Sequence, residues 1–132
     1  MSASAKPAAI AGPLVLDSSC WLEFFGKTAR LELFRAPILA VDKLVVPVVT
    51  IYEVYKKIRR ELGEDAATEA AALMQCGDVV DLTLPLTLAA AGNGLPLADS
   101  LIYATAQARG ATLWTQDAHF DGLPGVRYFS KT

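Results

Sequence analysis

The sequence predicts an α/β fold built on a parallel sheet, and two observations support that prediction. Short β-rich runs alternate with longer helical patterns along the whole chain after residue 13, as in α/β proteins. Glycines close most of the helical patterns, at the position where helices usually stop. With 132 residues, of which 53% are hydrophobic, the chain is long enough for one domain with its own core. We therefore expect residues 14–132 to form a single domain, preceded by a loose leader over residues 1–13.

Five short runs of apolar and β-branched residues predict the strands. The first four have the continuous apolar character of strands buried in a parallel sheet, and the last is expected at an edge. The predicted strands are Leu14–Leu16, Leu44–Val46, Val79–Leu82, Thr112–Thr115 and Val126–Phe129.

Six helical patterns lie between these strands. In the third, apolar residues recur with helical spacing, so we expect that face to pack on the sheet. Pro37 is expected to kink or split the second, because proline disrupts a helix interior. The predicted helices are Ser18–Phe25, 29–41, Thr50–Leu62, Asp65–Cys76, Thr83–Asn93 and Ala98–Arg109.

Composition and motifs exclude most common functional classes. The 12 Lys and Arg residues against 14 Asp and Glu give a net charge of −2, without the basic excess of a simple nucleic-acid binder. His119 is the only histidine, and Cys20 and Cys76 are too far apart for a thiolate metal site. No glycine-rich phosphate loop or nucleophile elbow is present. No apolar stretch could cross a membrane, and the few cysteines favour a reducing compartment such as the cytoplasm.

Four carboxylates stand at junctions between predicted elements: Asp17, Glu53, Asp99 and Asp117. Three of them follow the first, second and fourth strands, so we expect them along the carboxyl edge of the sheet, where ligands bind. The sequence does not determine on which edge of the sheet Asp99 lies, because two helices separate the third and fourth strands. Two carboxylates ~4 Å apart repel by ~4 kcal/mol at an effective dielectric of about 20. Mg²⁺ or Mn²⁺, held by oxygen ligands alone, would relieve that repulsion.

Each of these carboxylates also has a purely structural interpretation. Asp17 can cap the helix that follows it. Thr50 and Glu53 form a capping-box pattern. Asp99 can favour the positive end of the last long helix, and Asp117 can cap a short turn at residues 118–120. A metal site and four separate helix caps are therefore both open.

Four segments of the chain resemble the PIN-domain ribonucleases, and in particular the VapC toxins of toxin–antitoxin pairs. They are Val15–Ser19, Thr50–Val54, Leu97–Ala106 and Thr115–Phe120, in the family's order. The resemblance implies a three-layer α/β/α PIN-like fold with a mainly parallel central sheet of four to five strands. It also implies an endoribonuclease that depends on Mg²⁺ or Mn²⁺ and cleaves RNA. The implied partners are a small VapB-like antitoxin and a second copy of the chain.

The resemblance also implies roles for individual residues. The metal ligands and catalytic groups would be the four carboxylates, Asp17, Glu53, Asp99 and Asp117. The hydroxyls of Ser19 and Thr115 are candidate partners behind them. His119 is expected to be a structural turn residue, although it could donate to a phosphate or a leaving oxygen. Asp121 is expected to be a turn residue that lies close enough to act as an accessory acid.

Two surfaces beside the predicted site suggest binding. One helical face, shared with Glu53, could hold an RNA backbone through Lys56, Lys57 and Arg60. The alternative for this face is a solvated Glu53–Lys57 ion pair. The aromatic first helix, with Trp21 and Phe25, is a candidate surface for a second copy or an antitoxin.

Two other classes of function remain as alternatives. A catalytically silent PIN-fold binding module would keep the fold without the chemistry. A phospho-acceptor signalling domain has a similar size and an acidic Mg²⁺ pocket, but it needs an adjacent acidic pair after the first strand. Here Asp17 is followed by two serines, which disfavours that class.

Overall fold

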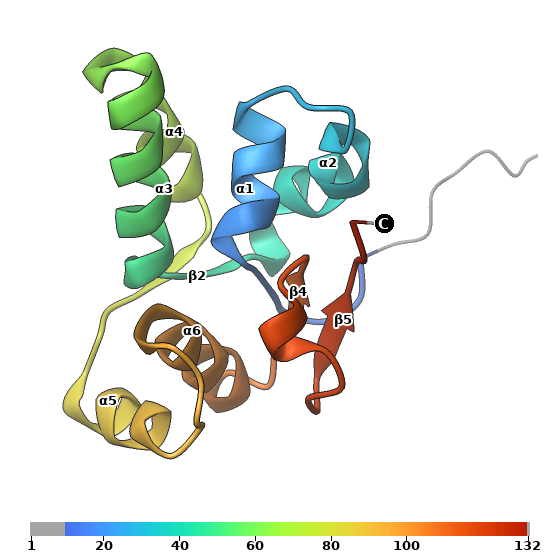
Figure 1. Cartoon of the computed structure of the whole chain (residues 1–132), viewed down its shortest axis with the longest axis vertical. Helices are drawn as coiled ribbons and strands as arrows, with labels where there is room; N and C mark the ends of the chain where they lie inside the picture. The colour runs from blue at the N-terminus through green and yellow to red at the C-terminus, as the bar shows by residue number, and fades with distance from the viewer. Residues whose placement is uncertain (1–9, 132) are drawn as a thin grey trace, which may run out of the picture.

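The structure is a computed structural model that describes residues 10–131 (Figure 1). The predicted leader over residues 1–13 therefore lies mostly outside the described residues. At its end, Ile10 packs against the core, and the Pro13 carbonyl accepts a hydrogen bond from the Thr112 amide at 3.1 Å. None of the helices within residues 10–131 combines the length and the apolar character needed to cross a membrane.

The strands form one parallel layer in the order β3-β2-β1-β4-β5. Strands β1 (Leu14–Leu16), β4 (Thr112–Thr115) and β5 (Val126–Tyr128) pair in that order, and β2 (Val45–Pro47) pairs with β3 (Asp78–Val80). A parallel bridge between Leu14 and Leu44 joins the two ladders. Every ladder is parallel, which confirms the predicted parallel sheet of four to five strands.

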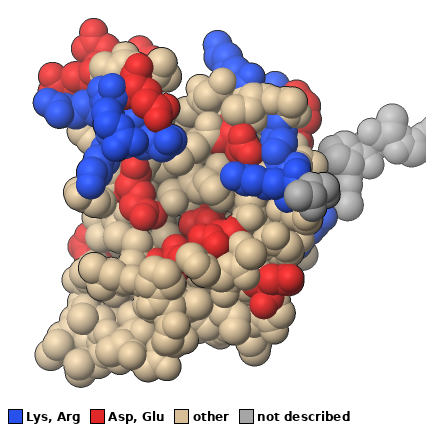
Figure 2. All heavy atoms as spheres, in the orientation of Figure 1, with Lys and Arg blue, Asp and Glu red and all other residues tan. Residues whose placement is uncertain are grey.

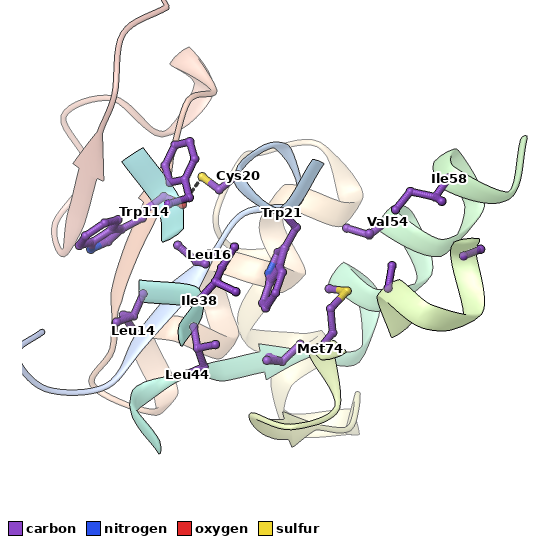
Figure 3. Packing of buried hydrophobic residues seen from close by; sticks show 14 residues of the cluster. Leu14, Leu16, Cys20, Trp21, Ile38, Leu44, Val54, Ile58, Met74 and Trp114 are labelled. Carbon is purple, nitrogen blue, oxygen red and sulfur yellow. Dashed lines mark hydrogen bonds between the residues drawn. The ribbon is translucent and has the colours of Figure 1, made fainter. Parts of the chain in front are cut away.

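Alternate residues of the central strands point to opposite faces and enter separate cores. Leu14 and Leu16 join the larger core with Trp114, whereas Val15 joins a second core with Leu113. The larger core is filled by side chains from four helices, among them Trp21, Ile38, Val54 and Met74 (Figure 3).

The helices cover both faces of the sheet, so the fold has the predicted three layers. On the side of the larger core lie α1 (Ser18–Phe25), α2 (Leu31–Leu39), α3 (Val48–Leu62) and α4 (Glu64–Met74). Helix α6 (Leu97–Ala108) packs on the second core, and α5 (Leu84–Ala91) packs on α6 (Figure 1). Two 3₁₀ turns, Val41–Lys43 and Ala118–Phe120, complete the order of elements.

The structure corrects three of the predicted elements. Helix α3 begins at Val48 rather than Thr50, because Pro47, the last residue of β2, takes the extended N-cap conformation. Strand β3 is half exposed and lies at an edge, as β5 does, so the expectation that it is buried was wrong. Pro37 is accommodated within α2, which ends at Leu39, and does not split that helix.

Candidate metal centre

The predicted acidic residues meet at the carboxyl edge of the sheet. Asp17 directly follows β1, Asp117 comes shortly after β4, and Glu53 lies in the second turn of α3, after β2. Asp99, in the first turn of α6, reaches the same edge, because its Oδ2 lies 3.1 Å from Nδ1 of His119. Acidic side chains gather at the middle of this face of the molecule (Figure 2).

Asp17 is the most deeply buried of the four carboxylates, with 3% of its surface exposed. Its Oδ1 accepts from the Ser18 amide at 2.8 Å, and its Oδ2 accepts from the hydroxyls of Thr115 at 2.9 Å and Ser19 at 3.2 Å. Burial raises the pKa of Asp17 to about 6, and the negative charges of Asp99 and Glu53 add to the rise, whereas the Thr115 hydrogen bond opposes it. The fold therefore holds this carboxylate in place at an energetic cost.

Glu53 is tied to the same edge through α1. Its Oε1 accepts from the Ser18 hydroxyl at 2.9 Å. Half-burial raises the pKa of Glu53, the Ser18 hydrogen bond lowers it, and the charge of Asp99 raises it further. The prediction of a capping box between Thr50 and Glu53 was wrong, because α3 starts two residues before Thr50.

Asp99, Asp117 and His119 form the open side of the cluster. The His119 Nδ1 lies 3.1 Å from Asp99 Oδ2 and 3.2 Å from Asp117 Oδ1. Burial raises the pKa of Asp99, the hydrogen bond from His119 lowers it, and the charge of Asp117 raises it. The hydrogen bond to Asp99 raises the pKa of His119, as does the charge of Asp117. When protonated, the exposed His119 ring is a counter-ion to both carboxylates.

The donor set fits a divalent cation. One ligand atom each from Asp99, Asp117 and His119 lies within 4.8 Å of the others. Throughout residues 10–131, no lysine or arginine forms an ion pair with any of the four carboxylates. Closely grouped oxygen ligands without a balancing lysine or arginine are the environment that Mg²⁺ or Mn²⁺ prefers.

Two of the capping interpretations hold together with this cluster. Asp17 is the N-cap of α1, and the Asp117 side chain accepts from the His119 amide at 2.9 Å, which caps the 3₁₀ turn. A carboxylate has two oxygens and several lone pairs, so a cap leaves capacity for other partners. Capping and convergence are therefore compatible in these two residues.

Comparison with known proteins identifies the family. The PIN domain family matches residues 14–126, which is most of the chain. The chain belongs to the PIN domain family. Among curated proteins, no sequence matches it.

Solved structures show the same fold. A chain of a toxin–antitoxin complex from Klebsiella pneumoniae superimposes with a TM-score of 0.72 at 18% identity, over 86% of this chain and 95% of that one. VapC20 from Mycobacterium tuberculosis, a toxin that cleaves the sarcin–ricin loop, gives 0.71 at 18% identity over 86% and 96%. DNA-bound VapBC from Salmonella typhimurium gives 0.67 at 17% identity over 90% and 98%. These likenesses confirm that the chain has the PIN fold seen in VapC toxins.

Sequence reasoning missed several residues that support the site in this PIN domain. Ser18 joins α1 to Glu53. Gln116 is buried beside the site and accepts a hydrogen bond from Arg30, whose guanidinium also donates to the Ser130 carbonyl at 3.1 Å. Asp121, which was expected to be a turn residue, is exposed at the end of the 3₁₀ turn. The position of Ser18 directly after Asp17 could have indicated its role in the site. The Arg30–Gln116 contact, by contrast, joins residues that no sequence spacing relates.

The predicted basic face lies next to the acidic residues. Tyr52, Glu53 and the three predicted cations, Lys56, Lys57 and Arg60, line one open hollow on α3. Lys57 pairs with Glu61 at 2.8 Å, whereas Glu53 accepts from Ser18, so the Glu53–Lys57 alternative was wrong. Figure 2 shows the blue side chains beside the central acidic area.

Proposed function

We propose that this PIN domain is a metal-dependent endoribonuclease and the toxin of a toxin–antitoxin pair. The observation that supports this best is the convergence of four carboxylates, three of them desolvated and none paired with lysine or arginine within residues 10–131. The likeness to a toxin that cleaves the sarcin–ricin loop supports the choice of RNA as substrate.

Asp17, Glu53, Asp99 and Asp117 would hold the Mg²⁺ or Mn²⁺. When bound, such an ion neutralises a phosphodiester, lowers the pKa of water and stabilises a leaving oxygen. The chain's own side chains orient the ligands: Thr115 and Ser19 fix Oδ2 of Asp17, and Ser18 fixes Oε1 of Glu53. When protonated, His119 can donate to a phosphate oxygen through Nε2, because Nδ1 is engaged with Asp99 and Asp117.

Cleavage of RNA in the presence and absence of metal tests this function. The purified protein is expected to cut total cellular RNA with Mg²⁺ or Mn²⁺ and to stop when a chelator is added. Glu53→Gln should lose the activity, whereas Asp121→Asn, an exposed neighbour of the site, should keep it. Cleavage that persists in chelator, or that survives Glu53→Gln unchanged, would contradict a metal-dependent mechanism.

The alternatives fit the geometry less well. A silent binding module has no need for converging carboxylates whose burial destabilises their charged forms. A phospho-acceptor domain needs an acidic pair after the first strand, and there the structure places Ser18 and Ser19 as hydrogen-bond donors to carboxylates.

The basic face is expected to track the RNA backbone. Replacing Lys56, Lys57 and Arg60 together with alanine should weaken RNA binding. The salt dependence should flatten by up to about 0.7 in log–log slope for each phosphate that the variant no longer neutralises. Lys57 should contribute least, since Glu61 already neutralises it. Binding measured by fluorescence anisotropy over a range of salt concentrations checks this. A slope equal to that of the parent would show that the three residues form a solvated face that does not bind the RNA backbone.

An antitoxin would be the protein partner. The likeness to chains of two toxin–antitoxin complexes supports this assignment. An apolar groove between α1, α3 and α4 is a candidate binding site for an antitoxin segment. It is lined by Phe25 of α1, the exposed Leu62 of α3 and the half-buried Leu73 of α4. Trp21, by contrast, is buried and cannot contribute to a binding surface. Free Cys20 and Cys76 agree with a cytoplasmic location for the pair.

The second copy is expected to bind elsewhere. Residues 82–98 contain no charged side chain and expose Leu84, Leu88 and Leu97 by 70%, 65% and 79%. Uncovered apolar surface of this kind favours self-association. Light scattering should report a dimer for the parent and a monomer for Leu88→Glu. A parent that is monomeric at micromolar concentration would refute the homodimer.

A further inference from the structure

Helix α3 carries an aromatic and basic stripe, of which only Lys56 belongs to the basic face described above. Tyr52, Tyr55, Lys56 and Arg59 follow the i, i+3, i+4, i+7 spacing of one helical face. With Arg60 they line an open hollow on the outer side of α3. The core side of the helix is formed instead by buried residues such as Val54. Tyr52, Lys56 and Arg59 are exposed to solvent, whereas Tyr55 is half-buried and packs against the larger core.

Tyr52 lies on the surface of α3, and 61% of it is exposed. The Lys56 ammonium lies 5.6 Å from the centre of the Tyr52 ring. This places a positive charge against the ring face while most of the ring stays open to solvent. An exposed ring beside a cation presents both a stacking surface and a phosphate-binding group.

Part of the positive charge of this stripe has no anionic partner at ion-pair distance, although Arg60 lies close enough to Glu61 to help lower the pKa of that carboxyl. Of the four cations from Lys56 to Arg60, Lys57 has an anionic partner, Glu61. In the described part of the chain, neither Arg59 nor Arg60 forms an ion pair. Such cations are available to an anionic ligand. The two arginines lie about two helical turns beyond Tyr52, roughly 10 Å along the axis.

The stripe is continuous with the acidic site. Tyr52 precedes Glu53 in the chain and lines both hollows of α3, the outer one and the one that contains Glu53. Glu53 in turn is held by Ser18, the neighbour of Asp17. A ligand that occupies the outer hollow can therefore continue directly toward the four carboxylates.

We infer that Tyr52 stacks against an unpaired RNA base beside the acidic site, while Lys56, Arg59 and Arg60 hold the phosphates of the same single-stranded segment. This inference rests on the proposed function and specifies its substrate as a locally single-stranded RNA. Aromatic rings combined with a basic groove bind single strands through base stacking and backbone contacts. A continuous duplex would satisfy the cations but not the ring, because its bases are already stacked.

A comparison of two RNA probes separates stacking from charge. Binding of labelled oligoadenylate and of an abasic ribose–phosphate oligomer of equal length is measured in chelator, so that no cleavage occurs. Tyr52→Ala should weaken oligoadenylate binding by about 5- to 150-fold, the decrease expected for one base–aromatic stack. The same variant should leave abasic binding and the salt slope unchanged. Tyr52→Phe, which keeps the ring, should bind as the parent does.

The cations should behave in the opposite way. Replacement of Lys56, Arg59 and Arg60 with alanine should weaken both probes and flatten the salt slope, whereas Lys43→Ala, an exposed lysine on another element, should change neither. A duplex of the same length should bind Tyr52→Ala nearly as well as it binds the parent.

Several results would overturn the inference. One is an equal weakening of both probes on Tyr52→Ala, and another is no weakening of either. A third is intact RNA binding combined with weaker binding of the antitoxin, which would make the stripe a protein interface. Because binding is measured without metal, this assay does not depend on whether the protein cleaves RNA, and the nuclease proposal is tested separately. Tyr52-dependent stacking without any cleavage in Mn²⁺ would refute the catalytic proposal and leave the stacking site standing.

Discussion

Asp99→Asn is expected to abolish RNA cleavage without destabilising the metal-free protein. Asp99 sits among like charges, and both burial and the charge of Asp117 raise its pKa. The neutral amide removes that repulsion and can still accept the hydrogen bond from His119. Cleavage should fall by more than about a hundredfold, since loss of even an outer partner of a metal ligand can cost about that much.

Thermal melting of parent and variant in chelator provides the stability measurement. The capping interpretation predicts the opposite result. In that interpretation Asp99 interacts favourably with the positive end of α6, and its loss costs about 0.3–1 kcal/mol of stability with no effect on cleavage. A less stable Asn variant that still cuts RNA would support the cap and remove Asp99 from the proposed site.

The metal-free protein is expected to become more stable as the pH falls from 7 toward 4. Burial raises the pKa of Asp17 from its usual 3.8 to about 6, so between these values the native state binds more protons than the unfolded chain. The stabilisation is complete below the unfolded pKa and is lost as the pH rises through about 6. For Asp17 it amounts to about 3 kcal/mol. The raised pKa values of Glu53, Asp99 and His119 act in the same direction.

Urea unfolding at several pH values, in chelator, measures this dependence. Asp17→Asn should remove most of it, because the amide does not titrate and can still accept from the Ser18 amide. Asp42→Asn, an exposed carboxylate in the Val41–Lys43 turn, serves as the control and should leave the pH profile unchanged. Stability that falls steadily from pH 7 to 5 in the parent would contradict the raised pKa.

Much of the fold follows from local patterns in the sequence. Strand β1 is wholly buried and closely matches its apolar run, and α1 ends at Phe25, directly before Gly26. The predicted boundaries of elements were wrong where contacts with other parts of the fold determine them. Pro47 could be placed either in a strand or in a helix cap, and only its pairing in β2 sets the start of α3. The exposure of β3 depends on the order of the strands, which its sequence does not contain.

The meeting of the four carboxylates at one edge of the sheet was predictable only in part. Parallel topology implied that acids following β1, β2 and β4 would share an edge, whereas the position of Asp99 depends on how α6 packs against the sheet. His119 lies in the 3₁₀ turn, as expected, but its contact with Asp99 of α6 is not visible in sequence spacing. The exposed apolar surface of α5 was also missed, since only the packed structure shows which leucines remain uncovered.

The central claim is that Asp17, Glu53, Asp99 and Asp117 form one metal site, and calorimetric titration with Mn²⁺ tests it most directly. The parent should bind Mn²⁺ with release of protons, since the carboxyl groups with a raised pKa must lose their protons to bind the ion. At about a hundredfold excess over Kd, Mn²⁺ should stabilise the fold by about 2.7 kcal/mol. Asp99→Asn and Asp117→Asn should each lose this binding, whereas Asp121→Asn should keep it. Equal binding heats for all four proteins, or none for the parent, would contradict the site.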